Sequence, residues 1–598
     1  MSRSGRKARV RWSWIAFCSV APIFLLLAGM TLAYPIAAGA LRVGQAGLGS
    51  WISYGYGEGH WLIGWTHVIR YSGDPRVWKA VGLAGAFTIV ALAGVSFILV
   101  MLLWQPAKQP DLERRHLRGS RLIEKRDMPG EIIELAASAL HGAGSKEMRA
   151  WVRSAQDIEA DAEEERRILD HALKSGRPLT PGEARAEARV NAIGRLAVRD
   201  GLVRFGNLPL PRQLETLHGL ICASTGTGKS VALRQLLADI RRRGDRAIVV
   251  DAGYDMSESF RRKGDKVLSP FDSEAVGWNL RNEIKAPHEW QTYAASLFPD
   301  QAGESGEWAR RARIFFANAA MRAGAQMTNS ELFKMITQSD VAELQATLEA
   351  ESSATFQKGA EGILGSVRSI IETNLAAWQF TRDGDFSCRE YMLGEDPGWL
   401  WLPYRDTEKG VLGPSIGAWL DILILAGLER ASVKDGRFPR TWIVIDELDS
   451  IGAINSLKDA VTRLRKSNIA VVCAIQDYGQ LVERYGAQTA STLFGCFSNR
   501  LFLRCNSSDL AEKASKEIGL AEMEETRVQA GQSANNAGSR TTTGVNATTM
   551  ISIVKQEIVM ASELQHLPTL EGFVTLADRP FIYPVTQNLW PDVAAPAT

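Results

Sequence analysis

Cysteine is scarce in this chain and never occurs in closely spaced pairs. The 598 residues include six cysteines, and no two of them form a C-x-x-C motif. Disulfide frameworks and structural zinc sites both need cysteines at short, regular spacings. The spacing therefore favours neither of them, and it is typical of thiols that are kept reduced in a cytosol.

Net charge is also small. The chain carries 69 basic and 67 acidic residues, which gives a formal charge of +2 at pH 7. This balance excludes a polycationic nucleic-acid coat, although a local basic surface or pore could still bind DNA. A chain of 598 residues is too long for one hydrophobic core, so we expect about two to four domains, and no internal repeat is visible.

Two long stretches lack charged residues altogether. Residues 12–41 follow an acid-free, arginine-rich start, and residues 80–107 form the second stretch. Each is longer than the roughly 20 helical residues that cross a hydrocarbon core of about 30 Å. A cleaved signal peptide is the alternative for the first stretch, because Ala38-Gly39-Ala40 resembles a cleavage site of small residues. The apolar core of a signal peptide, however, would span only about 7 to 15 residues. We therefore predict a membrane anchor over residues 1–126, with transmembrane helices at about 12–41 and 80–107.

Basic residues flank the outer ends of both stretches. They are Arg3, Arg6, Lys7, Arg9 and Arg11 before the first, and Lys108, Arg114, Arg115, Arg118, Arg121, Lys125 and Arg126 after the second. Positive flanks stay on the cytoplasmic side of a membrane. The rest of the chain is therefore expected in the cytoplasm, where ATP is, even if the first stretch were cleaved.

A phosphate-binding loop is predicted directly after the apolar run Leu220 to Cys222. A helix-like segment, VALRQLLADIRRR, follows the loop, so the order is strand, loop, helix. Glycines let backbone N–H groups face phosphate oxygens, a lysine adds positive charge, and a serine hydroxyl can reach Mg²⁺. The predicted nucleotide-binding residues are Ser224, Thr225, Gly226, Thr227, Gly228, Lys229 and Ser230, with Ser230 also on the metal.

This loop departs from the usual G-x-x-x-x-G-K-[ST] pattern in one place, because Ala223 occupies the first glycine position. The chain must therefore accept a methyl group where it leaves the strand. A dinucleotide-binding loop is the competing interpretation. It is disfavoured because Gly226-x-Gly228-x-x-Val231 lacks the third glycine and contains Lys229 instead.

A second apolar run, Trp442 to Ile445, ends in the paired acids Asp446 and Glu447. Such a run is typical of a buried parallel strand that delivers carboxylates to a magnesium nucleotide. We predict that Asp446 binds the metal through its water shell and that Glu447 is the general base that polarises the attacking water. A pair of acids is by itself a common strand end, and the phosphate loop upstream is what favours the catalytic role.

Three further residues are weaker candidates. Asp251 ends the run Ala247 to Val250, which we expect beside the phosphate strand, and it is equally well explained as a turn residue. Gln476 ends the run Ile469 to Ile475, next to the acid-bearing strand, where it could contact the γ-phosphate or the water. Arg465 is either an arginine finger that reaches a neighbouring subunit or an ordinary surface charge.

The remaining patterns divide the chain. Residues 127–200 are predicted as a polar helical region, with Thr180 as the N-cap of a helix that starts at Pro181. Strand and turn signals then open a nucleotide-binding domain made of residues 201–282 and 395–598, and residues 283–394 form an inserted all-helical domain. The Gly-, Ser-, Thr- and Asn-rich segment 531–549 is predicted as a mobile loop.

Taken together, these motifs resemble the type IV coupling proteins of conjugative secretion systems, and in particular their TraD-type members. The resemblance covers nearly the whole chain. It is carried by the two N-terminal spans, TGTGKS at 225–230, VVDAGYD at 249–255, PFDS and GWN within 270–279, WLPYR at 401–405, IVIDELDSIG at 443–452 and the strand that ends at Gln476. Departures are Ala223 and the Asp251-Ala252-Gly253 segment, where a proline commonly follows the acid.

The resemblance implies an α/β fold with a RecA-like P-loop NTPase domain, an inserted all-helical domain and a two-helix transmembrane hairpin. It implies a homo-hexameric ATPase of the bacterial inner membrane that uses ATP and Mg²⁺ and links relaxase-bound, single-stranded DNA to a type IV secretion channel. It also implies that Arg465 is the arginine finger and that Gln476 senses the nucleotide.

Two other functions stay open at this point. A double-stranded DNA translocase would use the same chemistry, but more membrane spans and a winged-helix tail would be expected. A membrane receptor that recruits protein cargo to a secretion machine would have ATP hydrolysis as a secondary activity. Binding to single-stranded DNA, duplex DNA and protein substrates would separate the three.

Overall fold

The computed structural model of the chain describes residues 114–141, 145–299, 304–323, 327–348, 361–433, 438–537, 540–577 and 579–587, with a few isolated positions between 73 and 82. The predicted membrane spans, at about 12–41 and 80–107, lie outside the described residues apart from Gly82. The chain forms two compact units, residues 1–113 with 527–550 and residues 114–526 with 551–598. The second unit contains the predicted phosphate loop and both predicted acids.

A ten-stranded sheet organises the second unit, with the strand order β2-β15-β14-β11-β5-β10-β9-β6-β8-β7. The strands are β2 Arg121–Leu122, β5 Gly219–Cys222, β6 Arg246–Ala252, β7 Lys266–Val267, β8 Leu400–Tyr404, β9 Thr441–Ile445, β10 Ile469–Ile475, β11 Asn499–Phe502, β14 Glu571–Thr575 and β15 Phe581–Thr586. From β11 to β7 every neighbouring pair is parallel, while β14 is antiparallel to both β11 and β15. The prediction of an α/β fold is confirmed.

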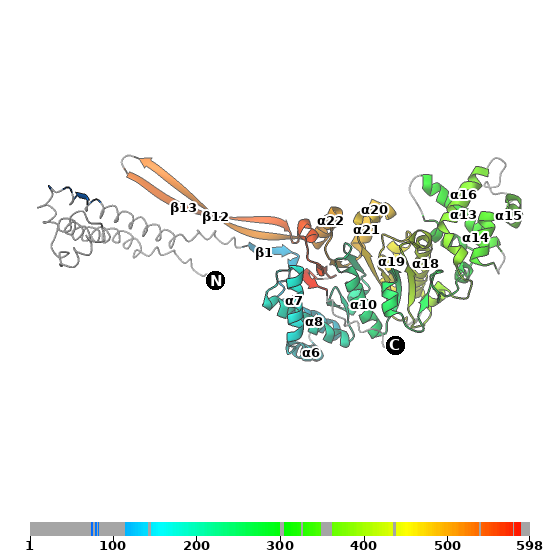
Figure 1. Ribbon diagram of the computed structural model, residues 1–598, viewed down its shortest axis with the longest axis horizontal. Helices are drawn as coiled ribbons and strands as arrows, with labels where there is room; N and C mark the ends of the chain where they lie inside the picture. Colours follow the sequence, from blue (N-terminus) through cyan, green and yellow to red (C-terminus); the bar gives the residue numbers. More distant parts are fainter. Residues whose placement is uncertain are drawn as a thin grey trace. The chain divides into compact units, whose positions relative to one another are not determined.

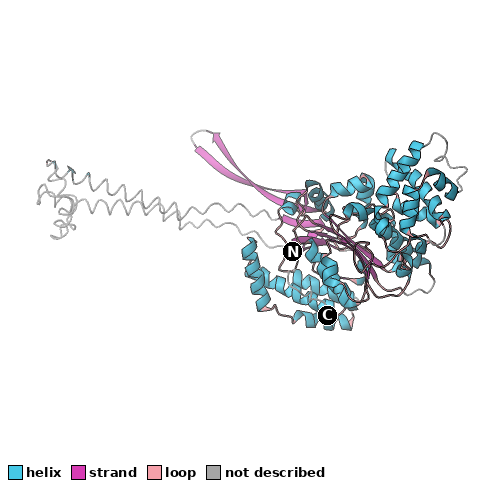
Figure 2. Ribbon diagram, turned by 45° about the vertical axis from the view of Figure 1, so that its right-hand side comes forward, coloured by secondary structure: helices cyan, strands magenta, loops and turns pink. Residues whose placement is uncertain are grey.

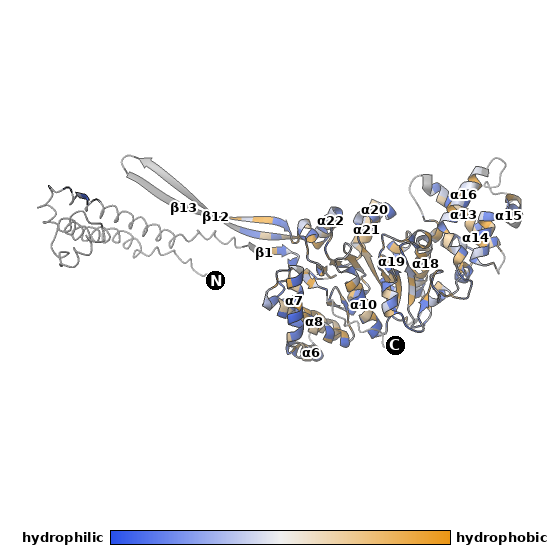
Figure 3. Cartoon of the chain, viewed as in Figure 1, coloured by the Kyte–Doolittle hydropathy of each residue, from blue (hydrophilic) through white to orange (hydrophobic). Residues whose placement is uncertain are grey.

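Both faces of the sheet are buried, because successive residues of its central strands enter different cores. In β9, Trp442 and Val444 belong to one core, whereas Ile443 and Ile445 belong to the other. This explains why the central strands are continuous apolar runs and do not alternate with polar residues. Figure 3 shows the apolar colours concentrated on these strands and on the helices that touch them.

Helices cover both faces of the sheet (Figure 2). On the first face lie α5 Met128–His141, α8 Pro181–Arg199 and α10 Lys229–Arg243, and on the second lies the long helix α18 Lys409–Glu429. Other described helices of this unit are α6 Lys146–Gln156, α7 Ala162–Ser175, α9 Arg212–Glu215, α11 Asp255–Phe260, α19 Leu457–Arg463, α20 Tyr478–Tyr485, α21 Ala487–Cys496, α22 Ser508–Ile518 and α23 Ala561–Gln565, and α17 Cys388–Leu393 lies at the end of the predicted insertion.

Within the described residues, one helical stretch, Lys409–Ser432, is long and apolar enough to cross a membrane. Its most apolar window is 78% buried inside the protein. Leu412, Leu420 and Leu423 on α18 are each fully buried in the core of the second face. The apolar composition of α18 is therefore explained by packing between the sheet and the insertion.

The predicted helical insertion is observed as helices. It contains α12 Glu289–Leu297, α13 Glu304–Arg322, α14 Asn329–Gln338, α15 Val341–Leu348, α16 Glu361–Asn374 and the 3₁₀ helix η4 Ala376–Phe380, and α13 to α16 gather together in Figure 1. Its two ends meet at Glu283, which is fully buried. This carboxylate accepts hydrogen bonds from Trp278 Nε1 at 2.7 Å, Cys388 N at 2.8 Å and Arg389 N at 2.9 Å. These bonds fasten the start and the end of the insertion to each other.

The described residues of 127–200 are mainly helical, as predicted, and form α5 to α8. Thr180 caps α8 with a complete capping box, in which Glu183 donates its N–H to the threonine hydroxyl and its carboxylate accepts the Thr180 N–H. A small hairpin, β3 Val203–Phe205 and β4 Leu208–Leu210, follows at the position where strand signals begin. The domain boundaries themselves stay predictions.

The prediction of a loop at 531–549 is wrong. This segment belongs to β12 Leu520–Ala537 and β13 Arg540–Glu557, which form a three-stranded sheet with β1 Arg114–Gly119. Its glycine, serine and asparagine content suggested a loop, but β-branched residues recur through β13, among them Thr541, Thr543 and Val545. Such residues favour strands, and backbone pairing needs no apolar side chains.

A histidine just before β5 gives the fold a pH dependence. His218 is 2% exposed, and its Nδ1 accepts a hydrogen bond from Val471 N at 3.1 Å. Burial lowers its pKa from 6.5 to about 4. In the unfolded chain the ring has its ordinary pKa of 6.5. The stability that the neutral, buried ring contributes is therefore complete above pH 6.5 and decreases as the pH falls toward about 4.

We expect the wild type to lose about 2 kcal/mol of unfolding free energy through this residue between pH 7.5 and 5.0, at about 1.4 kcal/mol per pH unit. Asparagine tolerates the left-handed backbone at this position, where φ is 61°, and its side-chain oxygen can accept the same hydrogen bond. His218→Asn should therefore reduce the pH dependence by that amount in urea titrations. Exposed His288→Asn is the matched control, and equal slopes for wild type and His218→Asn would contradict the prediction.

Candidate functional site

The predicted phosphate loop lies between β5 and α10, which begins at Lys229. Gly226 and Gly228 have φ of 73° and 118°, so both adopt a backbone conformation that favours glycine. Inside the loop, Thr227 Oγ1 donates to Ser224 O at 2.7 Å. A glycine-rich turn at a helix N-terminus directs N–H groups toward an anion, so this turn has the geometry of a phosphate site.

Ala223 is accommodated without strain. It does not belong to the residues with positive φ, and its N–H donates to Ile475 O at 3.1 Å, which extends the pairing of β5 with β10. Its methyl group is fully buried in the core of the first face. The glycine that usually stands here is therefore not required by this backbone.

Lys229 contacts both predicted acids. Its Nζ lies 3.0 Å from Asp446 Oδ1 and 3.3 Å from Glu447 Oε1, although the acids lie more than two hundred residues further along the chain. Lys229 is 8% exposed and Asp446 is 7% exposed. Burial raises the pKa of Asp446 above its ordinary value, and the ammonium group of Lys229 opposes this effect. The structure thus brings the phosphate loop and the paired acids into one charged cluster.

Strand order explains the position of Gln476. Because β10 lies between β5 and β9, its carboxyl end reaches both the phosphate loop and the acids. Gln476 Nε2 donates to Glu447 Oε1, and Gln476 Oε1 accepts from Thr225 Oγ1 at 2.7 Å. Gln476 therefore connects Glu447 to the loop, and its role as a nucleotide sensor stays a prediction.

The expected position of Asp251 is wrong. Its strand, β6, is not beside the phosphate strand, because β10 and β9 lie between them. The carboxylate is fully buried and accepts the N–H groups of Met256 at 3.2 Å and Ser257 at 2.7 Å, both in the short helix α11. Burial raises its pKa to about 6. Asp251 thus holds the turn between β6 and α11, which agrees with its alternative interpretation as a turn residue.

Arg465 lies in the 3₁₀ helix η6 Leu464–Ser467 and is exposed. It does not line the cavity that contains Lys229 of its own chain. Its predicted role in a neighbouring subunit is compatible with this position and stays a prediction.

A cavity of about 510 Å³ surrounds the cluster. The described residues that line it are His171, Thr225, Gly226, Gly228, Lys229, Ser230, Val231, Ala252, Gly253, Asp255, Asp406, Asp446, Glu447, Gln476, Thr569 and Leu570. The sequence had not suggested His171, Asp255, Asp406, Thr569 or Leu570. Two of these had a nearby signal, because Asp255 ends the VVDAGYD segment and Asp406 directly follows the WLPYR segment.

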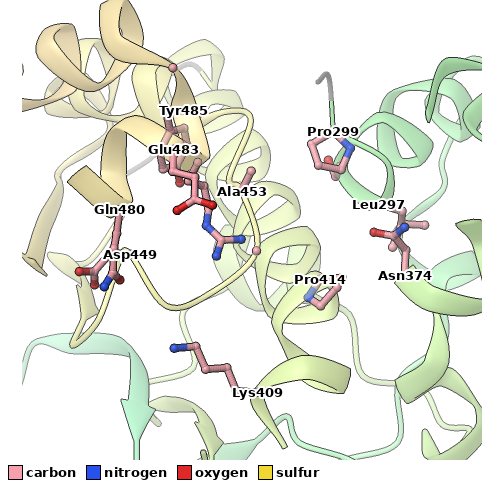
Figure 4. Close-up of a pocket in the computed structure, with 14 residues that line it drawn as sticks. Leu297, Pro299, Asn374, Lys409, Pro414, Asp449, Ala453, Gln480, Glu483 and Tyr485 are labelled. Atoms are coloured by element: carbon pink, nitrogen blue, oxygen red, sulfur yellow. The ribbon is translucent and has the colours of Figure 1, made fainter. Parts of the chain in front are cut away.

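A second cavity, of about 780 Å³, lies between the helices α12 and α16 and the segments that follow β9 and β10 (Figure 4). Leu297, Pro299 and Asn374 line one side, and Asp449 and Gln480 lie on the opposite side. Asp449 Oδ2 also accepts the N–H groups of Gln476 at 3.2 Å and Asp477 at 3.3 Å. The wall of the second cavity therefore holds the end of β10, from which Gln476 reaches Glu447.

Several known proteins are similar to this chain. TraD, a coupling protein of Escherichia coli (strain K12), is 28% identical over 400 residues, which cover 64% of this chain and 54% of TraD. VirD4, a type IV secretion system-coupling protein of Bartonella quintana (strain Toulouse), is 29% identical over 143 residues, which cover 24% of this chain and 21% of VirD4. The chain thus spans about half the length of TraD and about a fifth of the length of VirD4.

Solved structures of the conjugative coupling protein TrwB share the fold. The unbound monoclinic form is 31% identical with a TM-score of 0.59, and it matches over 65% of this chain and 89% of the TrwB chain. TrwB in complex with ADP and Mg²⁺ is also 31% identical, with a TM-score of 0.57 and the same coverage.

The family model described as the type IV secretion-system coupling protein DNA-binding domain matches residues 202–587. This range is more than half of the chain and includes the phosphate loop, the insertion, the paired acids and the strands up to β15. The chain therefore belongs to the family of type IV secretion-system coupling proteins.

Proposed function

We propose that this protein is an ATP-hydrolysing motor of the bacterial inner membrane that moves relaxase-bound, single-stranded DNA into a type IV secretion channel. The observation that carries the proposal is the contact of Lys229 with both Asp446 and Glu447, at 3.0 and 3.3 Å, inside the region that matches the family. Its RecA-like domain would be formed by residues 201–282 and 395–598.

The site fits ATP and Mg²⁺. TrwB has been solved with ADP and Mg²⁺, with an ATP analogue and with a GTP analogue. Ser230 and Asp446 line the cavity and would supply oxygen ligands, and the described residues contain no cluster of three or more acidic, cysteine or histidine side chains that could hold a metal alone. Mg²⁺ is usually bound by one or two protein groups together with phosphate oxygens and water, which this ligand set permits.

Each residue of the cluster then has a defined task. Bound Mg²⁺ would neutralise charge on the β- and γ-phosphates, and Lys229 would hold the same phosphates from the opposite side. Glu447 would orient the attacking water and accept its proton as the water oxygen bonds to the γ-phosphorus, while the bond from that phosphorus to the β-phosphate oxygen breaks and ADP leaves. Gln476, hydrogen-bonded to both Glu447 and Thr225, would report the presence of the γ-phosphate to the end of β10.

The assembly around this site is also a proposal. Two transmembrane helices, at about residues 12–41 and 80–107, would anchor a homo-hexamer whose nucleotide-binding domains face the cytoplasm. Each site would receive Arg465 from the neighbouring subunit. DNA would pass through the ring and be held by its phosphate backbone, without base recognition.

We expect single-stranded DNA to stimulate ATP hydrolysis by the full-length protein in detergent or lipid nanodiscs. Phosphate release should be measured with single-stranded DNA, duplex DNA and a candidate protein cargo at two salt concentrations. Because backbone binding releases counterions, the stimulation should weaken at the higher salt concentration. Stimulation by duplex DNA alone would favour a double-stranded DNA translocase, and stimulation by cargo alone would favour a receptor of protein substrates.

A further inference from the structure

The strand order places different residues at the two ends of the cavity around Lys229. The acids Asp446 and Glu447 follow β9, which lies on one side of the phosphate strand β5. Thr569 and Leu570 precede β14, which lies on the other side of β5, beyond β11. A triphosphate on the loop would direct its γ-phosphate toward the acids, so its nucleoside would lie toward the β14 side.

Leu570 is held firmly at that second end. Its φ is 72°, a conformation that a leucine rarely adopts, and its N–H donates to Thr227 O in the phosphate loop at 2.9 Å. Its carbonyl oxygen accepts the N–H of Gln587 at 2.7 Å. A side chain at Gly228 would meet Leu570 Cδ2 at 3.0 Å, so leucine and loop are in close contact. Strained residues of this kind persist where the surrounding structure fixes them, often beside a ligand.

Helix α7, in the helical region that precedes the phosphate loop, reaches the same end. His171 on α7 lines the cavity together with Val231, Thr569 and Leu570. Directly after this helix, Arg177 forms an ion pair with Glu571, the residue that follows Leu570. The side chains of Arg177 and Glu571 are 5% and 12% exposed, so the pair fastens the end of α7 to the cavity wall.

The other end of α7 is fastened as well. Glu164 is 7% exposed and accepts hydrogen bonds from Asn191 Nδ2 at 3.0 Å and Arg195 Nη2 at 2.8 Å, both on α8. Glu164 and His171 are seven residues apart, which is two helical turns, so they lie on the same face of α7. The bonds that dock Glu164 therefore also orient His171.

We propose that α7 completes the nucleoside subsite of this ATPase, with His171 contacting the base or ribose and with Val231 and Leu570 supplying the apolar wall. The proposal rests on the proposed function, because it assigns residues to the same nucleotide. Imidazole can stack on a base or hydrogen-bond to it, and an apolar wall on either side favours a planar ring. Arg177, Glu571 and Glu164 act as positioning residues that hold α7 against the cavity.

The test compares a nucleotide with a ligand that lacks the nucleoside. Binding of ATP, GTP and inorganic tripolyphosphate to the full-length protein should be measured by calorimetry for wild type and His171→Ala. We expect His171→Ala to weaken ATP binding about fivefold, the cost of one lost hydrogen bond or ring contact, and to change tripolyphosphate binding less than about twofold. GTP serves to show whether the contact discriminates between purines.

His288→Ala is the matched control, because His288 is an exposed histidine outside the site. Unchanged tripolyphosphate binding also shows that His171→Ala leaves the phosphate loop folded. Wild-type ATP affinity in His171→Ala, or an equal loss for both ligands, would overturn the nucleoside subsite alone. A wild-type protein that binds neither ATP nor tripolyphosphate would overturn the proposed function and the subsite with it.

Discussion

Lys229→Ala is expected to abolish ATP hydrolysis, with a decrease of at least about 10³-fold in kcat/KM. The ammonium group is the positive charge of the phosphate loop, and it contacts Asp446 and Glu447 directly. Without this ammonium group, the phosphates of the nucleotide would lose the cation that binds them. Its removal also leaves the buried carboxylate of Asp446 and the half-buried carboxylate of Glu447 without their shared cation, and their negative charge disfavours a further anion in the same cavity. The variant should therefore lose nucleotide affinity as well as turnover.

Measurements should combine steady-state phosphate release with equilibrium binding of a non-hydrolysable ATP analogue. Glu447→Gln is the informative comparison, because it keeps the size of the side chain and the Lys229 charge but removes the proton acceptor. We expect Glu447→Gln to bind the analogue at least as tightly as wild type while hydrolysis falls by about 10²-fold or more. Retained hydrolysis in Lys229→Ala would remove the assignment of this cavity as the ATPase site.

The phosphate loop and the paired acids were identifiable from sequence because each is a short local pattern. Glycine at two left-handed positions, a lysine at the helix start and two acids after an apolar strand all depend on residues that are adjacent in the chain. The burial of β9 on both faces was also visible, since Trp442 to Ile445 contains no polar residue. The membrane spans were equally clear as patterns, and they stay predictions.

Strand order and the walls of the cavity could not be predicted in this way. The position of β10 between β5 and β9 depends on crossovers between distant segments, so Asp251 was expected in the wrong place. Leu570 has no sequence signal for its left-handed backbone, because that conformation is imposed by its bonds to Thr227 and Gln587. His171 lies on a helix whose charge pattern is that of a solvated surface, and only the docking of α7 brings it to the cavity around Lys229.

Arg465→Ala is expected to reduce kcat by about 10³-fold and to leave nucleotide affinity within about twofold of wild type. We expect kcat to fall without a loss of nucleotide affinity because Arg465 is exposed and does not line the cavity of its own chain. An arginine supplied by a neighbour stabilises charge that develops as the γ-phosphate leaves, so it acts on the transition state more than on the bound nucleotide. Lys466→Ala is the matched control, because Lys466 is the next residue and is also exposed.

Mixing two inactive variants tests where that arginine acts. A Lys229→Ala subunit has no working site but still carries Arg465, whereas an Arg465→Ala subunit has a complete site but no arginine to donate. In a closed ring with head-to-tail interfaces, about a quarter of the interfaces in a random equimolar mixture would pair an intact site with an intact arginine. Co-expressed or reassembled mixtures should therefore regain ATP hydrolysis that neither variant shows alone. If Arg465 served the site of its own subunit, every subunit in the mixture would lack one of the two groups, and no mixture would recover activity.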